Sequence, residues 1–278
     1  MLVAGCLQPP ATTAPMQEGL RAYQRGRYEA ALVAFRQAVA EEPRNLVART
    51  NLALTLQDLG RYGEALPLYE ELIVAQPGNP VPWINKAVCL RELGRLEESL
   101  ATLDEVENRR IATPYTAFNR GLVYEEQNLW GKAMEAYQEA SEQAPDQAVI
   151  YYRLGRVYES LGEPNQALKV YTKALLIKPT DPLTRLRLGE LYTARGQYSS
   201  AIREYSKLTV LAPSTSQLYY RLARLYRQQD RLDKALEMLH KALELKPDDQ
   251  ELQQELKEVL EDLVKPDRRP LESNPRAG

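Results

Sequence analysis

The chain has few of the residues from which active sites and metal centres are built, with 2 Cys, 1 His and 14 Gly among 278 residues. Its cysteines and its histidine do not have the spacing of a metal site, and its glycines stand singly, unlike a phosphate-binding loop. We expect His240 on the surface of a helix. Carboxylates such as Glu125, Glu126 and Glu159 are expected to be solvated, because charged rows on a repeat protein usually face water. The sequence therefore predicts no enzyme, no cofactor and no metal.

The chain also lacks a dominant charge and a long apolar run. Lys and Arg number 36 against 38 Asp and Glu, which leaves a net charge of −2 and no field to hold nucleic acid. Apolar residues make up 44% and the mean hydropathy is −0.48, enough for a folded core and too little for a membrane-spanning bundle. The aromatic residues are 17 Tyr, 2 Phe and 2 Trp. This excess of tyrosine favours half-buried rings whose hydroxyls reach water or a carbonyl.

What the chain does have is a repeat of 34 residues. Its clearest marker is a proline at the end of an apolar segment, as in YTKALLIKP, which recurs at intervals of 34 or 68 residues. The skipped place is Ile111. With that proline at position thirty-two, seven units follow without insertion: 12–45, 46–79, 80–113, 114–147, 148–181, 182–215 and 216–249.

Other positions of the unit are equally regular. Positions eight and twenty are always small, and positions eleven and twenty-four are mostly Tyr or Leu, so two helices can approach closely at fixed places. Position fifteen holds residue types that tolerate a left-handed backbone, which predicts the end of one helix and the start of another in each unit. These residues are Gly26, Gly60, Gly94, Asn128, Gly162, Gly196 and Asp230. Each unit is thus predicted to be a helical hairpin.

These columns resemble the tetratricopeptide repeat over 12–249, most closely in WINKAVCLRELGRLEESL and YYRLGRVYESLGEPNQALKVYTKALLIKP. The resemblance implies an all-α fold, a right-handed α-solenoid of seven hairpins. Residues 250–264 continue at helical spacing and are predicted to form a capping helix, and 265–278 are predicted to be a disordered tail. The third unit carries ENRRIATP in place of its closing proline, which predicts a bend before Pro114.

The resemblance also implies that the first helix of each hairpin lines a concave face. Positions five, nine and twelve give an apolar strip in the first four units and polar anchors later, and a contiguous exposed strip usually marks a contact. The predicted groove for a helix or extended segment of another protein consists of Met16, Leu20, Thr50, Leu54, Ile84, Val88, Phe118, Leu122, Tyr152, Arg156, Tyr220, Arg224 and Arg227. The alternatives are that the strip is ordinary packing between repeats, or that the N-terminal segment covers it. No unit has the Lys and Asn pair with which some family members grip a chaperone's carboxylate.

The N-terminal residues 1–11 differ from the repeats, and Val3-Ala4-Gly5-Cys6 resembles the lipobox of bacterial lipoproteins. Only Met1 and Leu2 precede it, so the hypothesis requires a start upstream, with Cys6 as the lipid attachment site and the only link to a membrane. The predicted function is a non-catalytic scaffold for protein binding, anchored in a bacterial cell envelope. The alternatives are a self-associating oligomer, or a cytoplasmic adaptor if the lipobox match is chance. Cys89 is expected to be a small buried residue.

Overall fold

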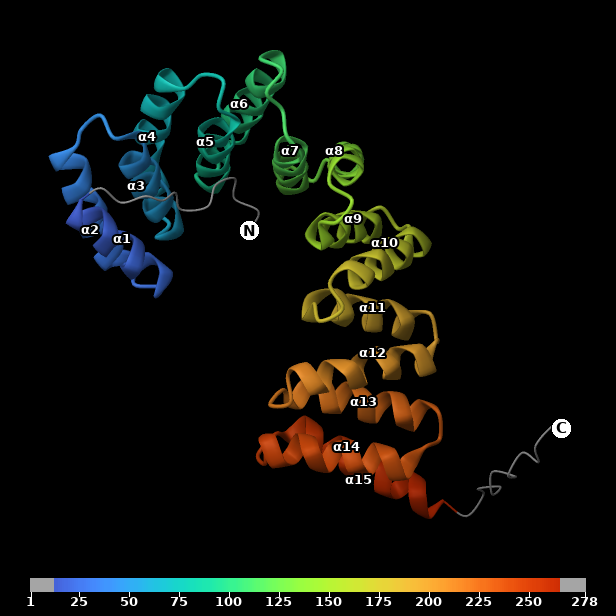
Figure 1. Ribbon diagram of the computed structural model, residues 1–278. Coiled ribbons are helices and arrows are strands. Elements are labelled where there is room, and N and C mark those ends of the chain that lie inside the picture. The colour runs from blue at the N-terminus through green and yellow to red at the C-terminus, as the bar shows by residue number, and fades with distance from the viewer. Residues whose placement is uncertain (1–12, 266–278) are drawn as a thin grey trace. The chain divides into compact units, whose positions relative to one another are not determined.

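A computed structural model describes residues 13–265, and within that range it contains helices and no strands (Figure 1). The first helices of the hairpins are α1 (Ala14–Gln24), α3 (Leu46–Asp58), α5 (Pro80–Glu92), α7 (Pro114–Glu126), α9 (Ala148–Ser160), α11 (Pro182–Ala194) and α13 (Ser216–Gln228). The second helices are α2 (Tyr28–Glu41), α4 (Tyr62–Ala75), α6 (Leu96–Asn108), α8 (Trp130–Gln143), α10 (Pro164–Ile177), α12 (Tyr198–Leu211) and α14 (Leu232–Leu245). A last helix, α15, spans Gln250–Val264, the range predicted for a capping helix.

The helices form two compact units. The first ends at Glu163 and contains α1–α9, and the second starts at Pro164 and contains α10–α15. Within each unit every helix packs against the next one along the chain. Hairpins packed in series are the α-solenoid that the repeat predicts.

The turn inside each hairpin is made by the residue at position fifteen. All five glycines predicted there have a positive φ, between 69° and 74°, and Asn128 and Asp230 follow them with φ of 57° and 56°. Each residue ends the first helix in a left-handed backbone, the conformation that Gly, Asn and Asp adopt at low cost. The second helix then begins two residues later, as at Pro164, where a missing N–H does no harm. The sequence prediction of these turns is confirmed.

Close packing inside a hairpin depends on a glycine facing an aromatic ring. A Cβ added at Gly121 would lie 2.5 Å from the ring of Tyr137, and one added at Gly189 would lie 2.6 Å from the ring of Tyr205. Most tyrosines at position twenty-four are fully buried, so the expected half-buried sites are wrong for this column. Their hydroxyls bond to side chains rather than water; Tyr69, for example, donates to Gln57 at 2.8 Å.

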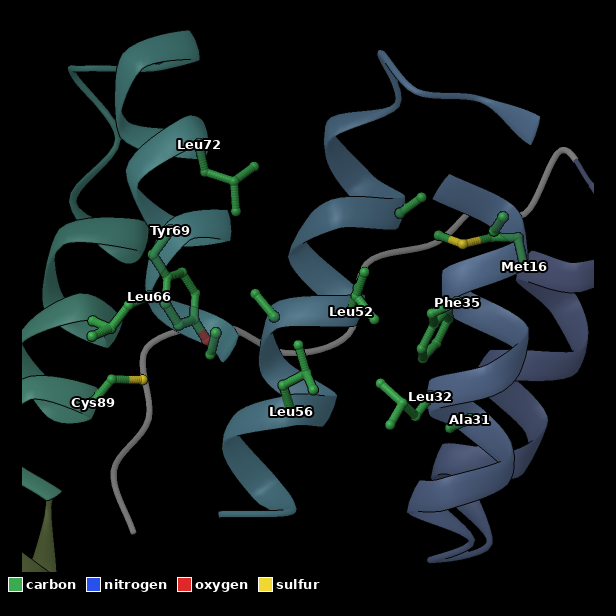
Figure 2. Close-up of a cluster of buried hydrophobic side chains, with 14 of the residues drawn as sticks. Met16, Ala31, Leu32, Phe35, Leu52, Leu56, Leu66, Tyr69, Leu72 and Cys89 are labelled. Atoms are coloured by element: carbon green, nitrogen blue, oxygen red, sulfur yellow. The ribbon is translucent and has the colours of Figure 1, made fainter. Parts of the chain in front are cut away.

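The core of the first unit runs through successive hairpins. Figure 2 shows part of it, with side chains from α1 to α5 meeting in one layer that includes Met16, Phe35, Leu52, Tyr69 and Cys89. In the second unit a comparable cluster joins α13, α14 and α15. Each hairpin therefore shares its core with its neighbours and depends on them for stability.

The third repeat departs from the others, as its sequence suggests. Helix α6 is one residue shorter than every other second helix, and Arg110 after it has a left-handed backbone with φ of 58°. Its packing on α7 is the sparsest between consecutive helices of the first unit. Arg120 of α7 bridges this sparse contact with ion pairs to Glu107 at 2.5 Å and Asp104 at 3.1 Å. The bend predicted here stays a prediction.

Two predicted segments lie outside the described residues. One is the N-terminal segment with Cys6, and the other is the C-terminal tail beyond Lys265.

Candidate functional site

The predicted groove is mostly core. Six of its thirteen side chains are at most 6% exposed: Met16, Leu54, Ile84, Val88, Phe118 and Tyr220. Of the others, Leu20, Thr50, Leu122, Tyr152, Arg156 and Arg227 are partly buried, and Arg224 is exposed. The expectation of an exposed apolar strip is therefore wrong at the six buried positions. The reason is that first helices of adjacent repeats cover one another, and Phe118 also packs on the Tyr137 ring at 5.6 Å between centroids.

A hollow nevertheless remains on this face of the first unit, at α7. It has a volume of about 490 Å³ and an apolar lining in which Leu122 and Trp130 are partly exposed. We name it the α7 hollow; its lining residues are Val88, Arg91, Glu92, Phe118, Asn119, Leu122, Glu125, Glu126, Trp130, Val149, Arg153 and Arg156. Four of the predicted groove residues, Val88, Phe118, Leu122 and Arg156, thus lie around one hollow.

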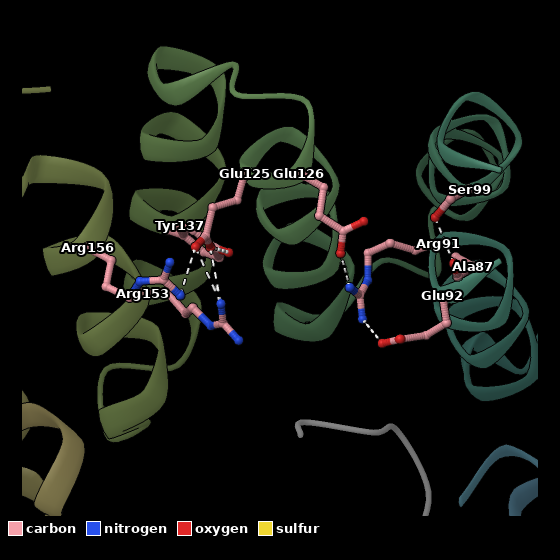
Figure 3. Close-up of polar contacts among 9 residues, drawn as sticks. All are labelled: Ala87, Arg91, Glu92, Ser99, Glu125, Glu126, Tyr137, Arg153 and Arg156. Atoms are coloured by element: carbon pink, nitrogen blue, oxygen red, sulfur yellow. Dashed lines mark hydrogen bonds and ion pairs between the residues drawn. The ribbon is translucent and has the colours of Figure 1, made fainter. Parts of the chain in front are cut away.

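On the α9 side of the α7 hollow lies a network centred on the buried carboxylate of Glu125 (Figure 3). Tyr137 donates to it at 2.7 Å, and Arg153 and Arg156 form ion pairs with it at 3.4 and 3.3 Å. Burial, and then the charge of Glu125, raise the pKa of Tyr137, so its hydroxyl remains a neutral donor. The network connects the fourth repeat to α9 and fixes both arginines at the rim of the hollow.

The α5 side of the hollow carries a second set of charges. Arg91 donates to Glu92 within its own helix and to Glu126 of α7, as Figure 3 shows. The rim therefore presents charges of both signs around an apolar floor. Such a surface suits a peptide side chain that is apolar and flanked by charged residues.

The second unit has a smaller hollow of about 430 Å³ at α13. Its lining is rich in tyrosine and arginine and includes Tyr205, Tyr220, Arg221 and Arg224. Tyr220 donates to Glu251 of α15 at 2.9 Å, and burial together with this bond raises the pKa of Tyr220 to about 12. One predicted anchor is therefore already used by the capping helix.

Arg227, another predicted anchor, is also bound by α15. It donates to Asp262 at 2.8 Å, to Glu255 at 3.0 Å and to Glu258 at 2.8 Å. The hydrogen bond from Arg227 lowers the pKa of Glu258, and those from Lys265 and then Arg227 lower the pKa of Asp262. Arg227 thus holds the cap in place, and it is not available to a partner while α15 is docked.

The remaining sequence candidates have no chemistry of their own in the structure. Cys89 is buried as predicted, and burial raises its thiol pKa to about 12. His240 is exposed. In residues 13–265 no three His, Cys, Asp or Glu side chains come together as a metal site would need. In the same range the helices are all too short or too polar to cross a bilayer.

Sequence reasoning missed part of the α7 hollow. Trp130 stands at the start of α8, and Val149 and Arg153 at positions two and six of their repeat, outside the three positions used to define the groove. The one available signal for Trp130 was the identity of the residue, because a partly exposed Trp is costly on a surface without a function.

Comparison with protein families places the chain among repeat proteins. Models described as tetratricopeptide repeat match residues 16–80, 56–110, 148–181 and 216–249, and one described as TPR repeat matches 121–162. Together these matches extend over more than half of the chain. A comparison with curated protein sequences gives no match.

Several solved structures share the fold. YrrB, described as a TPR protein with an unusual peptide-binding site, is 24% identical with a TM-score of 0.58, over 68% of this chain and 97% of YrrB. A tetratricopeptide repeat protein from Parabacteroides merdae is 18% identical with a TM-score of 0.56, over 88% and 97%. The C-terminal part of a TPR protein from Cytophaga hutchinsonii is 22% identical with a TM-score of 0.62, over 76% and 84%. At these identities the likeness is one of fold.

Proposed function

The chain belongs to the tetratricopeptide repeat family, whose members serve as protein-interaction scaffolds, and on this premise we propose that its α7 hollow binds a segment of a partner protein. The observation that carries the proposal is the combination, in one hollow, of the half-buried Leu122 and Trp130 with charged side chains from three first helices. Tryptophan and arginine are the residues most often responsible for affinity in protein interfaces.

The arrangement indicates what the bound segment carries. An apolar side chain would contact Leu122 and Trp130, and flanking charged residues would meet Arg156, 38% exposed, and Glu126, 41% exposed. Because these groups come from rigid helices, little ordering is needed on the scaffold side. The described peptide-binding site of YrrB supports this use of the fold.

Site-specific photo-crosslinking tests the proposal. A photoreactive amino acid at Leu122, in cells that make the protein, would attach to the bound segment, which is then identified by mass spectrometry and synthesised. The synthetic segment should bind the unmodified chain, and Leu122→Glu should weaken that binding at least tenfold because a charge would enter an apolar floor. Leu93→Glu is the matched control, since Leu93 is 44% exposed and lies outside the hollow.

Equal binding by the unmodified chain and Leu122→Glu would place the segment elsewhere and remove the proposal. Light scattering on the purified chain addresses self-association separately. If the crosslinked segment belongs to a second copy of this chain and the chain is an oligomer, the protein is a self-associating spacer and the partner proposal is wrong.

We also propose the envelope anchor, which depends on Cys6. A mass spectrum of the native protein decides it: a diacylglycerol on Cys6 as the first residue is the expected result. An unmodified chain that starts at Met1 would leave a cytoplasmic adaptor.

A further inference from the structure

The outer face of the second unit carries a charge pattern that the partner-binding proposal does not use. Residues 164–211 contain eight basic side chains against Asp181, Glu190 and Glu204, a net charge of +5 in a chain whose net charge is −2. The eight are Lys169, Lys173, Lys178, Arg185, Arg187, Arg195, Arg203 and Lys207. The excess lies in α10, α11 and α12, which follow one another along the second unit (Figure 1).

Part of this charge forms two equivalent stripes. Lys169, Lys173 and Leu176 stand four and three residues apart on α10, so they lie on one side of that helix. Arg203, Lys207 and Val210 occupy the same three positions of the next second helix, α12. Because α10 and α12 are equivalent elements of consecutive repeats, the stripes face the same way. All six side chains are exposed.

Each stripe ends in a protruding aliphatic side chain. Leu176 is 77% exposed and Val210 is 79% exposed, and Leu183 at the start of α11 is 56% exposed. The stripes lie outside the hollows at α7 and α13. The surface thus consists of aliphatic tips beside cations, and these side chains line neither hollow.

The cations are only partly compensated. Glu204 is 6% exposed and is shared by Arg185 at 2.6 Å, Arg203 at 3.3 Å and Lys207 at 3.5 Å, so a single carboxylate serves three positive groups. The pattern is also local. The corresponding positions of α8 are Glu135, Glu139 and Glu142, which shows that the repeat itself does not require basic residues there.

We propose that the stripes of α10 and α12 bind the surface of an anionic lipid bilayer. Three of the four stripe cations are lysines, and lysine is depleted from protein interfaces, whereas lysines near an anionic membrane each contribute about fivefold in affinity. The aliphatic tips would enter the boundary between headgroups and acyl chains. This contact uses the folded second unit and does not require a lipid on Cys6.

The test uses the full chain carrying Cys6→Ser, so that no acyl group contributes. We expect it to sediment with vesicles of phosphatidylcholine and phosphatidylglycerol at low salt, to be released at high salt, and to stay in solution with pure phosphatidylcholine. Lys169→Glu with Lys173→Glu should weaken vesicle binding at least tenfold. Leu176→Asn with Val210→Asn should weaken it several-fold while keeping its salt dependence.

The matched control is Lys246→Glu with Lys257→Glu, which makes the same change of net charge at exposed residues of the second unit outside the stripes. It should bind vesicles within twofold of the Cys6→Ser chain. Equal losses in both double variants would reduce the effect to net charge, and no binding to anionic vesicles would remove the proposal outright. So would an oligomer that the Lys169→Glu, Lys173→Glu change dissociates, because the stripes would then join copies of the chain. Thermal unfolding of each variant checks that these surface changes leave the fold intact.

Discussion

Glu125 and Arg227 occupy position twelve of their repeats, carry opposite charges, and are each bound by the next first helix along the chain. Glu125 pairs with Arg153 and Arg156 of α9, and Arg227 pairs with residues of α15 exactly as far along the chain, Glu255 and Glu258. The same contact is thus made twice with its charges reversed. Position twelve therefore connects successive repeats, and a helix carrying the wrong charges would meet repulsion there.

Arg227→Ala should loosen α15. Arg227 is the hub of three ion pairs with that helix, whereas the apolar contribution of α15 to its cluster is limited to Leu252, Leu256 and Val259. We expect a loss of about 1 kcal/mol, the scale of a partly exposed network. Hydrogen exchange should show faster exchange along α15 with little change in α11.

Arg224→Ala is the matched control, because Arg224 lies one turn away on α13 and its ring contact is with Tyr220 at 5.8 Å. Equal exchange of α15 in the two variants would show that the apolar contacts, and not Arg227, hold the cap.

Acid should release the same helix. The pKa values of Glu258 and Asp262 are lowered in the folded chain from their ordinary 4.5 and 3.8. Their contribution to stability is therefore complete above those ordinary values and is lost as the pH falls through the lowered ones. Protection of α15 against hydrogen exchange, corrected for intrinsic rates, should fall between about pH 6 and about pH 3. The Arg227→Ala chain should show a smaller fall, and an equal fall would assign the effect to other carboxylates.

Gly121→Ala should destabilise the fourth hairpin. The new Cβ would lie 2.5 Å from the Tyr137 ring, which is fully buried and cannot move aside cheaply. Overpacking of this kind costs about 1–3 kcal/mol. Gly131→Ala is the control, since no atom lies within 4 Å of its added Cβ, and we expect it to be neutral or slightly stabilising. Urea unfolding followed by tryptophan fluorescence reports on this hairpin through Trp130, and equal midpoints for the two variants would contradict the prediction.

Much of the fold could be predicted because the repeat tests itself. A small residue at position eight, as at Gly121, predicts a large one facing it, and a left-handed residue such as Asn128 predicts where one helix ends. These rules concern contacts within a hairpin, and they hold in every copy. The left-handed Arg110 could not be predicted from them, because it lies where the third repeat abandons the pattern.

The site was less predictable because exposure depends on neighbouring repeats. Helical spacing places Val88 and Leu122 on the same face, yet one is 2% exposed and the other is partly buried. What distinguishes them is how closely the adjacent first helices approach, which a 34-residue period does not encode. The partners of Glu125 were hidden for the same reason, since they are 28 and 31 residues away.

Glu125→Gln should weaken the junction between the fourth repeat and α9. The amide can still accept from the Tyr137 hydroxyl, but it no longer carries the charge that Arg153 and Arg156 meet at 3.4 and 3.3 Å. Both arginines are about one-third exposed and can turn toward water, so we expect a loss of about 1–2 kcal/mol rather than the larger cost of an isolated buried charge. Glu126→Gln alters an adjacent carboxylate that is 41% exposed and should cost less than about 0.5 kcal/mol. If the two variants unfold at the same urea concentration, the buried network of Glu125 contributes no more than a surface ion pair, and the role assigned to position twelve in joining the repeats is wrong.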